Sequence, residues 1–371
     1  ILIGVGVFYS AVFVPIPGSD AVRIEMKVVN HQEYSFKQYT SDLANMFEAN
    51  PKFKDPYLPT CIYVTSLFGG GIIMFRMITG FVYFYFLVSL LLSIYNDYQL
   101  SKYRSWIVTG FFLFLITFMP LCAGLTGVRW PTALMILLYS SYKLAITKEI
   151  KYFILACFAI PVHFAIIPSL LVVGMISFVP GMRNYYVVVI VLLVSILFAE
   201  NLSRIFLSFS DATESLEHST SVYTSDNYIE KRERTVARWN WYVSIGRHWP
   251  FQLSVIAVLI ISIIRKKLEI NSLTDRVFPL AVYFTVLALI TGGILEVNTN
   301  RFAKLSEFFV LLLLLGVWFN NKNNKIIKYM VWSFLFVFIF KTYLILNADV
   351  QTLGLLFFSN PLVVFVYNFI A

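Results

Sequence analysis

Charged residues are scarce in this chain of 371 residues. Asp, Glu, Lys and Arg together make up 13% of it, about half of the roughly 25% found in soluble domains. Apolar residues make up 59% and aromatic residues 18%, far more than one or two soluble cores hold. This balance excludes a soluble globular domain and a disordered chain. The long apolar stretches are continuous and lack the alternation of a β-barrel, so we predict an all-α, polytopic integral membrane protein.

Cysteine is also rare, and no metal-binding pattern is present. Cys61, Cys122 and Cys157 are widely separated, without zinc-ligand spacing, and an odd number argues against a disulfide framework. The sequence contains no glycine-rich phosphate loop after a strand and no nucleophile elbow. We therefore expect neither a metal nor a cofactor.

Apolar stretches occur along the whole chain, and about 20 residues suffice for one crossing. We expect about 11–13 transmembrane helices in a single membrane domain, 1–371. Residues 1–16 lack a charged n-region and a cleavage site, so they are expected to be the end of a membrane helix rather than a signal peptide. The stretches are 1–16, 72–95, 105–122, 129–146, 152–180, 184–200, 249–264, 277–295, 301–319, 329–347 and 351–371.

Residues 152–180 are too long for one ordinary crossing and too short for two. Pro161 and Pro168 can break a helix there, and short Lys- and Arg-rich loops stay on the cytoplasmic side. A hairpin of two short helices puts all such loops on one side, whereas a single helix does not, so we predict the hairpin. The loops contain Lys102/Arg104, Lys143/Lys148/Lys151, Arg183, Arg265/Lys266/Lys267/Arg276 and Lys322/Lys325/Lys328.

Two long polar segments, 17–71 and 201–248, then face outward, to the periplasm of a bacterium. Within the first, the apolar piece 57–68 is too short to span and is expected to be interfacial or re-entrant. The second is rich in Tyr and Trp near its end, which favours interfacial helices. The net charge of +9 fits basic loops beside an anionic leaflet better than nucleic acid, since no basic run with interleaved aromatics occurs.

Arg76, Arg129, His163 and Arg301 are predicted to lie at similar depth on the outer side, on separate helices. Charge at membrane depth usually faces a cavity, although Arg also anchors helix ends. Guanidinium groups bind phosphate bidentately and stabilise a departing diphosphate, which points to a lipid diphosphate. His163 either binds phosphate, accepts a proton from an attacking hydroxyl, or bonds a carbonyl freed by a nearby proline.

Carboxylates near the same side are Asp20, Glu296 and, less directly, Asp211. Each is a candidate base for a hydroxyl nucleophile or a counter-ion of the arginines. Lys304 and Glu307 are three residues apart on one predicted helix, so we expect them to pair or to line a cavity.

The order of these features resembles the EpsG family and, more broadly, the Wzy-type polymerases of O-antigen and capsule. It comprises Pro-Gly-Ser-Asp20 in an outward loop, Arg129 at a span start, a Lys-rich turn, His163 in a hairpin, and Asn300-Arg301-Phe302 at a late span. The sequence departs from the family where Ala21-Val22-Arg23 replaces the Tyr expected soon after the Asp, which bears on the role of Asp20.

The resemblance implies a metal-independent membrane glycosyltransferase of the all-helical GT-C-like kind in the bacterial inner membrane. Such proteins polymerise oligosaccharide repeat units carried on undecaprenyl diphosphate, at the periplasmic face. A chain-length-regulating co-polymerase and a flippase would be partners, besides membrane lipids. Arg129 and Arg301 would hold the donor diphosphate and His163 would lie beside it, while Arg76 joins this set from its predicted depth alone.

Other functions stay open at this point. A lipid-linked oligosaccharide flippase or transporter should show related halves and polar residues through the full membrane depth, whereas the candidates here gather on one side. A membrane acyltransferase or ligase acting on glycans shares the multi-span plan. A scaffold in an assembly complex would tolerate alanine at the Arg and His positions.

Overall fold

The computed structural model is all-helical through the residues that it describes: 1–15, 20–31, 33–47, 52–102, 106–116, 121–198, 201, 240–292 and 296–358, with the side chains of 292–300 and 348–358 left aside. The helices are α1 (Leu2–Val12), α2 (Asp20–Val29), α3 (Phe36–Ala44), η1 (Asn45–Phe47), α4 (Tyr57–Leu67), α5 (Ile72–Asp97), η2 (Leu100–Lys102), α6 (Trp106–Ile116), α7 (Ala123–Thr126), α8 (Arg129–Thr147), α9 (Ile150–Cys157), α10 (Ala159–Val162), η3 (Phe164–Ile166), α11 (Ile167–Phe178), α12 (Tyr185–Leu197), α16 (Trp241–Ile264), η4 (Arg265–Lys267), α17 (Ser272–Gly292), α18 (Glu296–Asn320) and α19 (Lys325–Phe358).

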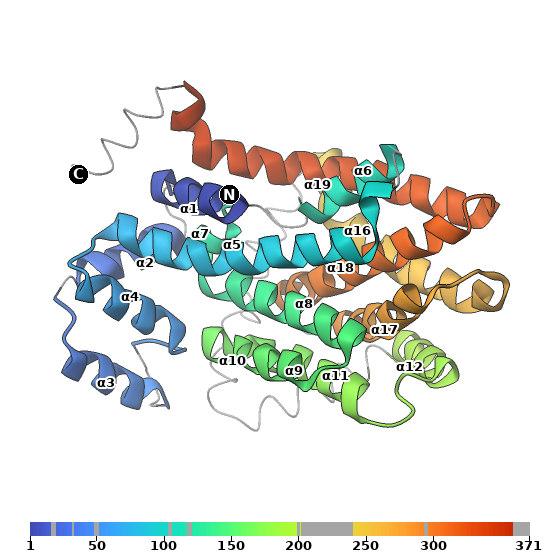
Figure 1. Ribbon diagram of the computed structural model, residues 1–371, viewed down its shortest axis with the longest axis horizontal. Coiled ribbons are helices and arrows are strands. Elements are labelled where there is room, and N and C mark those ends of the chain that lie inside the picture. Colours follow the sequence, from blue (N-terminus) through green and yellow to red (C-terminus); the bar gives the residue numbers. More distant parts are fainter. Residues whose placement is uncertain are drawn as a thin grey trace.

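The longest helices lie roughly along one axis, and α2, α3 and α4 gather at one end of the molecule (Figure 1). Within the described residues, five helices are long and apolar enough to cross a membrane, and five apolar stretches are shorter. This confirms the all-helical, polytopic membrane class. The total of 11–13 spans stays a prediction, because α1, α6 and α12 fall below the roughly 20 residues of a full crossing.

Helices α17 and α18 form the centre of the bundle. Residues 310–315 of α18 are completely buried, as are Phe284 and Phe309, whose rings stack with their centroids 5.3 Å apart. A helix that is apolar on all sides must be surrounded by other helices or by lipid. This central position fixes the start of α18, and with it Arg301.

Helix α1 crosses α5 at small residues. A methyl group on Gly6 would overlap the ring of Phe84, and one on Gly80 would overlap the Ser10 hydroxyl. Small residues four apart on a helix allow membrane helices to approach closely. The N-terminal helix is therefore closely packed onto the bundle.

The predicted hairpin in 152–180 is confirmed. The rings of Phe153 on α9 and Phe178 at the end of α11 lie 4.8 Å apart at right angles, whereas one continuous helix would separate these residues by about 38 Å. The chain reverses around His163, between α10 and η3.

The predicted break between the spans 329–347 and 351–371 is wrong. Helix α19 continues from Lys325 to Phe358 without interruption. The sequence Asn347-Ala348-Asp349 is polar and looks like a loop, but it contains neither proline nor glycine to end a helix. Residues 359–371 lie outside the described part of the chain.

Helix α16 begins at Trp241, earlier than the predicted start at 249, so Trp241, Tyr242 and Trp249 all belong to it. The other aromatic residues expected in interfacial helices lie in 202–239, outside the described residues. The predicted short apolar piece 57–68 is α4, which has 11 residues.

The Lys- and Arg-rich turns meet at one end of the bundle, called here the basic end. Lys143 of α8 lies 4.0 Å from Asp97 of α5, Arg276 of α17 donates to the Ile146 carbonyl, and Asn321 donates to the Glu269 carbonyl at 2.8 Å. These contacts agree with the prediction that the basic loops share a side.

Candidate functional site

A buried carboxylate joins two of the predicted site residues. Asp55 is 1% exposed, and its Oδ2 accepts a hydrogen bond of 2.9 Å from Arg129 Nη1. The same oxygen lies 3.4 Å from His163 Nδ1. Asp55, Arg129 and His163 come from three distant segments, and we call them the Asp55 cluster.

Asp55 is positioned by a small apolar core beneath the polar N-terminal segment. Phe53 and Leu58 on either side of it are buried, together with Phe75 of α5 and Val128 before α8. Pro56 follows directly as the N-cap of α4. The same core thus contains residues before and after Asp55 and the residue that precedes α8. It therefore holds the Asp55 carboxylate beside Arg129.

A strained turn sets the direction of Arg129. Val128 has φ of 37°, a value that β-branched residues rarely adopt, and the Arg129 N–H bonds back to the Gly127 carbonyl at 2.5 Å. This is the rare γ-turn with positive φ, and such strain persists where the surroundings impose it. Helix α8 then starts at Arg129 itself.

His163 lies at a break in the hairpin. Its backbone is extended, with φ of −162° and ψ of 114°, between α10 and η3. Pro161 and Pro168 lie on either side, and proline interrupts helical hydrogen bonding. The break turns the imidazole toward Asp55, while its Nε2 is buried and has no hydrogen-bond partner within the described part of the molecule.

Trp130 connects this cluster to Arg301. Its ring meets the His163 ring edge-on at 5.8 Å and the Phe302 ring at 6.4 Å. The guanidinium carbon of Arg301 lies 5.2 Å from the Trp130 ring centroid, a cation–π contact. Arg129, His163 and Arg301 thus come together, as the sequence predicted.

Lys27 of α2 adds positive charge beside the Asp55 cluster. Its Nζ donates to the Lys52 carbonyl at 3.3 Å and lies 5.1 Å from the Phe53 ring centroid. Burial lowers the pKa of Lys27, and the charges of Arg129 and Lys52 lower it further, while Asp55 acts in the opposite direction. Lys27 therefore lies close enough to Asp55 and Arg129 for the charges of both to affect its pKa.

Positive charge continues from Arg301 along the neighbouring helices. Lys304, one turn further along α18, lies within electrostatic range of Lys341 of α19, Arg247 of α16 and Arg301, and also of the acid Glu307. The expected pairing of Lys304 with Glu307 is corrected: the closest ion pair of Glu307 in the described residues is with Lys341. Lys341 of the facing helix α19, rather than Lys304 on the same helix, is therefore the ion-pair partner of Glu307.

Arg76 has other partners. It is 8% exposed, its Nε bonds to Glu25 Oε1 at 2.7 Å, and its Nη1 donates to the Phe13 carbonyl at 2.6 Å. These contacts connect α5 to α2 and to the end of α1. The predicted role of Arg76 in binding a diphosphate is not tested by this geometry and stays a prediction.

The carboxylates selected from the sequence are not the one in the cluster. Asp20 is exposed and pairs with Arg23 at 2.5 Å on the same helix. The side chain of Glu296 and the whole of Asp211 lie outside the described residues. Their predicted roles as bases stay predictions.

Sequence reasoning missed Asp55, Lys27 and the Lys341–Glu307 pair. Asp55 is one of many balanced charges in the segment 17–71. One signal was available in the sequence: Asp55 is the acid directly before Pro56 and the apolar helix α4.

Chemically, the Asp55 cluster and the neighbouring Arg301 combine two guanidinium groups with an oriented imidazole. An ionised carboxylate only accepts hydrogen bonds, so its contact to His163 Nδ1 places the proton there and leaves Nε2 as the acceptor. Within the described residues, no three His, Cys, Asp or Glu side chains form a metal-binding group. The expectation of a metal-independent site stays a prediction.

The family model of the EpsG family matches residues 61–359. The chain belongs to the EpsG family. At the family level this supports a Wzy-like polymerase that passes the membrane several times. Comparison with curated proteins and with solved structures gives no match. The matched region of this EpsG-family protein contains Arg129, His163 and Arg301, whereas Asp55 lies just before it.

Proposed function

We propose that this EpsG-family protein is a glycosyltransferase that polymerises oligosaccharide repeat units carried on undecaprenyl diphosphate. The observation that carries the proposal is the convergence of Arg129, His163, Asp55 and Arg301 from four distant segments. Two fixed cations beside an oriented imidazole suit a reaction in which a diphosphate leaves and a hydroxyl attacks.

Arg129 and Arg301 hold the donor diphosphate in this proposal. Each guanidinium has five N–H donors, and Arg129 uses one of them on Asp55. The remaining donors of Arg129 fit phosphate oxygens bidentately, and Arg301 adds a second positive charge. As the bond between the anomeric carbon and the diphosphate breaks, its electron pair moves to the diphosphate, and the two cations stabilise this developing charge. They supply the positive charge that a metal ion supplies in other transferases, so the reaction is metal-independent.

His163 accepts the proton of the attacking hydroxyl. The acceptor hydroxyl oxygen forms the new bond to the anomeric carbon, and its proton moves to His163 Nε2. Asp55 holds Nδ1 and stabilises the imidazolium that results. Asp55 is thus a positioning residue, and it also orients Arg129.

Family membership and the charge distribution support the proposed setting. The proposed site faces the periplasm at the inner membrane, since the basic end is expected in the cytoplasm. The products are O-antigen, capsular or exopolysaccharide chains. A flippase delivers the lipid-linked units, and a co-polymerase sets the chain length.

The experiment is a polymerisation assay with purified protein and lipid-linked repeat units. Arg129→Ala, Arg301→Ala, His163→Ala and Asp55→Asn should each lower the rate at least about 100-fold, while the protein still inserts and accumulates. Arg129→Lys should restore only part of the activity, because an ammonium cannot bind bidentately. Glu269→Gln, an exposed acid at the basic end, is the matched control.

Wild-type polymer length from any two of the three alanine variants would contradict the site assignment. The lipid that accumulates in cells without the protein tests the function separately. A single repeat unit on an outward-facing lipid supports a polymerase, whereas lipid trapped on the inner side indicates a flippase.

A further inference from the structure

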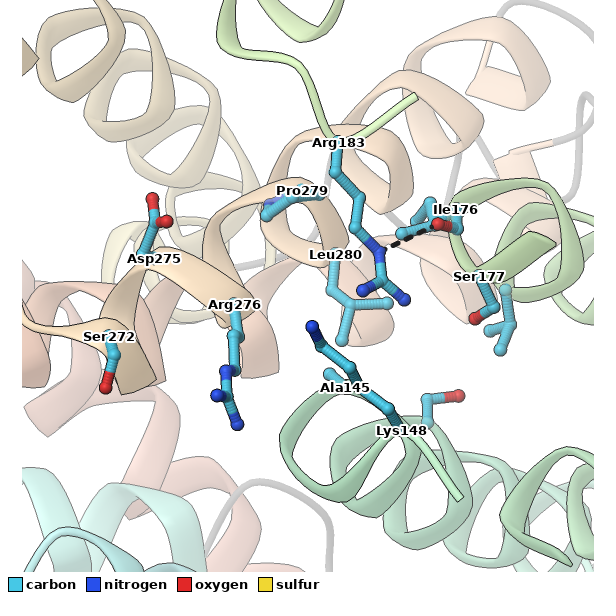
Figure 2. Close-up of a pocket in the computed structure, with 12 residues that line it drawn as sticks. Ala145, Lys148, Ile176, Ser177, Arg183, Ser272, Asp275, Arg276, Pro279 and Leu280 are labelled. Carbon is cyan, nitrogen blue, oxygen red and sulfur yellow. Dashed lines mark hydrogen bonds between the residues drawn. The ribbon is translucent and has the colours of Figure 1, made fainter. Parts of the chain in front are cut away.

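A cavity of about 220 Å³ opens at the basic end, at the opposite end of α8 from Arg129. The length of α8, 19 residues, separates the two places by about 28 Å. The cavity lies between α8, α11 and α17 and the turn before α12, so it is separate from the Asp55 cluster. Figure 2 shows its lining.

Three cationic side chains from three elements line this cavity: Lys148 after α8, Arg183 before α12, and Arg276 on α17. In Figure 2 the Lys148 ammonium and the Arg183 guanidinium point toward each other. Arg183 Nε donates to the Ile176 carbonyl at 3.0 Å, and Arg276 donates to the Ile146 carbonyl. Carbonyls fix these two guanidiniums in place without neutralising them.

The one acid in the lining has another partner. Asp275 forms its ion pair with Arg265, outside the lining, and Figure 2 shows its carboxylate turned away from the three cations. Among the described residues, no carboxylate lies within ion-pair distance of Lys148, Arg183 or Arg276. Lys148 and Arg183 face each other and repel, and a bound anion would relieve that repulsion.

A buried hydroxyl gives a second, independent observation. Ser141 lines the cavity, is 1% exposed, and its Oγ has no hydrogen-bond partner within the described part of the molecule. An unpartnered buried hydroxyl is unfavourable, because it has lost its hydrogen bonds to water. Ser177 and Ser272 line the same cavity. The preference of basic loops for one membrane side accounts for the cations, but it does not account for Ser141.

We propose that this cavity binds a phosphate group. Three cations and three hydroxyls are the donors that phosphate oxygens take up. The rest of the lining is apolar, with Ala145, Val173 and Leu280, which suits the glycerol and acyl part of an anionic phospholipid. A free phosphate ester offers the same oxygens, so the experiment separates these two sources.

The lipid arm measures phospholipid that stays bound to the full chain. The protein is placed in nanodiscs of phosphatidylglycerol and phosphatidylcholine, and native mass spectrometry counts each lipid retained. Lys148→Gln combined with Arg276→Gln should lower retained phosphatidylglycerol at least about tenfold, because charge-assisted hydrogen bonds are lost. Lys328→Gln, an exposed lysine on α19 outside the lining, should retain it as the unaltered protein does.

The second arm uses inorganic phosphate and glycerol 3-phosphate in nanodiscs of phosphatidylcholine alone. Each is scored by the rise in the midpoint of thermal unfolding, in the unaltered protein and in the double variant. Binding in the first arm identifies a lipid headgroup as the source, and binding in the second arm alone identifies a soluble phosphate. Either result supports the proposal when the double variant removes it.

Ser141→Ala separates a binding role from a structural one. Removing an unpartnered hydroxyl should leave the unfolding midpoint without phosphate unchanged or higher, yet it should weaken phosphate binding about threefold to tenfold. Equal retention in the unaltered protein and the double variant, or no binding in either arm, would overturn the proposal. The polymerase assignment does not depend on this outcome.

Discussion

One carboxylate oxygen organises the candidate site. Asp55 Oδ2 contacts both Arg129 and His163, while Oδ1 of the same group is buried without a partner among the described residues. Losing one partner of a buried ion pair is costly, about 3–5 kcal/mol when both partners are fully buried. Arg129 is 30% exposed in its side chain, so water reduces the cost here. Asp55→Asn therefore tests positioning more than folding.

The lowered pKa of Lys27 leads to a prediction of how diphosphate binding depends on pH. Burial and the charges of Arg129 and Lys52 lower its pKa, so as pH rises it loses its proton earlier than an exposed lysine does. Positive charge beside the Asp55 cluster then falls, and lipid diphosphate should bind more weakly. Lys27→Arg should hold its affinity to higher pH, because guanidinium stays protonated.

The measurement is the Kd of the unaltered protein and of Lys27→Arg for undecaprenyl diphosphate, from about pH 7 to about pH 10. The two should agree at the low end and diverge at the high end. Lys328→Arg serves as the control, with a profile like that of the unaltered protein. Coincident curves for all three would show that the charge of Lys27 does not contribute to diphosphate binding.

At the residue scale, the cationic residues of the site could be predicted from the sequence more readily than the residues that pair with them. Arg129, His163 and Arg301 stand out because charge is rare within apolar stretches. Asp55 stands among many charges of a polar segment, and only the packing of Phe53 and Leu58 against α5 buries it. The spacing of three residues predicted that Lys304 pairs with Glu307. The packing of α19 against α18 instead brings Lys341 close enough to form the ion pair with Glu307.

At the scale of elements, the crossing of α1 and α5 gives a matched pair of variants. Gly6→Ala places a methyl group into the Phe84 ring, whereas Gly4→Ala meets nothing within 4 Å. The first should destabilise the protein by about 1–3 kcal/mol through overpacking. The second should be neutral or stabilise by up to about 1 kcal/mol, since alanine favours helix.

Thermal unfolding in detergent, followed by fluorescence, measures both variants against the unaltered protein. A lower midpoint for Gly6→Ala alone supports close packing of α1 on α5. Equal midpoints for the two variants would contradict that contact.

Helix boundaries were predictable where the sequence carries a physical breaker. Pro161 and Pro168 together with the positions of basic loops predicted the reversal at His163, which the Phe153–Phe178 contact confirms. Polarity alone was a poor guide, because Asn347 and Asp349 lie within the continuous α19. The turn at Val128 could not be predicted, since nothing in a β-branched residue indicates positive φ.

At the scale of the whole molecule, the basic end and the site end lie at opposite ends of α8. The positive-inside rule predicts the basic end in the cytoplasm. Ser35→Cys near the site end should therefore react with a membrane-impermeant maleimide added to intact cells, after permeabilisation of the outer membrane. Lys266→Cys at the basic end should react only after the inner membrane is opened.

The native cysteines leave a low background for this labelling, because Cys61 and Cys122 are buried and Cys157 is half-buried. The reverse pattern would place the Asp55 cluster in the cytoplasm and would contradict a periplasmic reaction. Composition sufficed to predict the membrane class. The number of complete crossings was not predictable, because several apolar helices are shorter than a bilayer is thick.

The chain distances within the site have a consequence for biogenesis. Asp55 meets Arg129 across 74 positions and His163 across 108, and Arg301 arrives only with the last third of the chain. During synthesis, the proposed site residues thus cannot all come together before Arg301 has been added to the chain. In the proposed function, transfer could therefore begin only after the segment that contains Arg301 has been inserted into the bilayer.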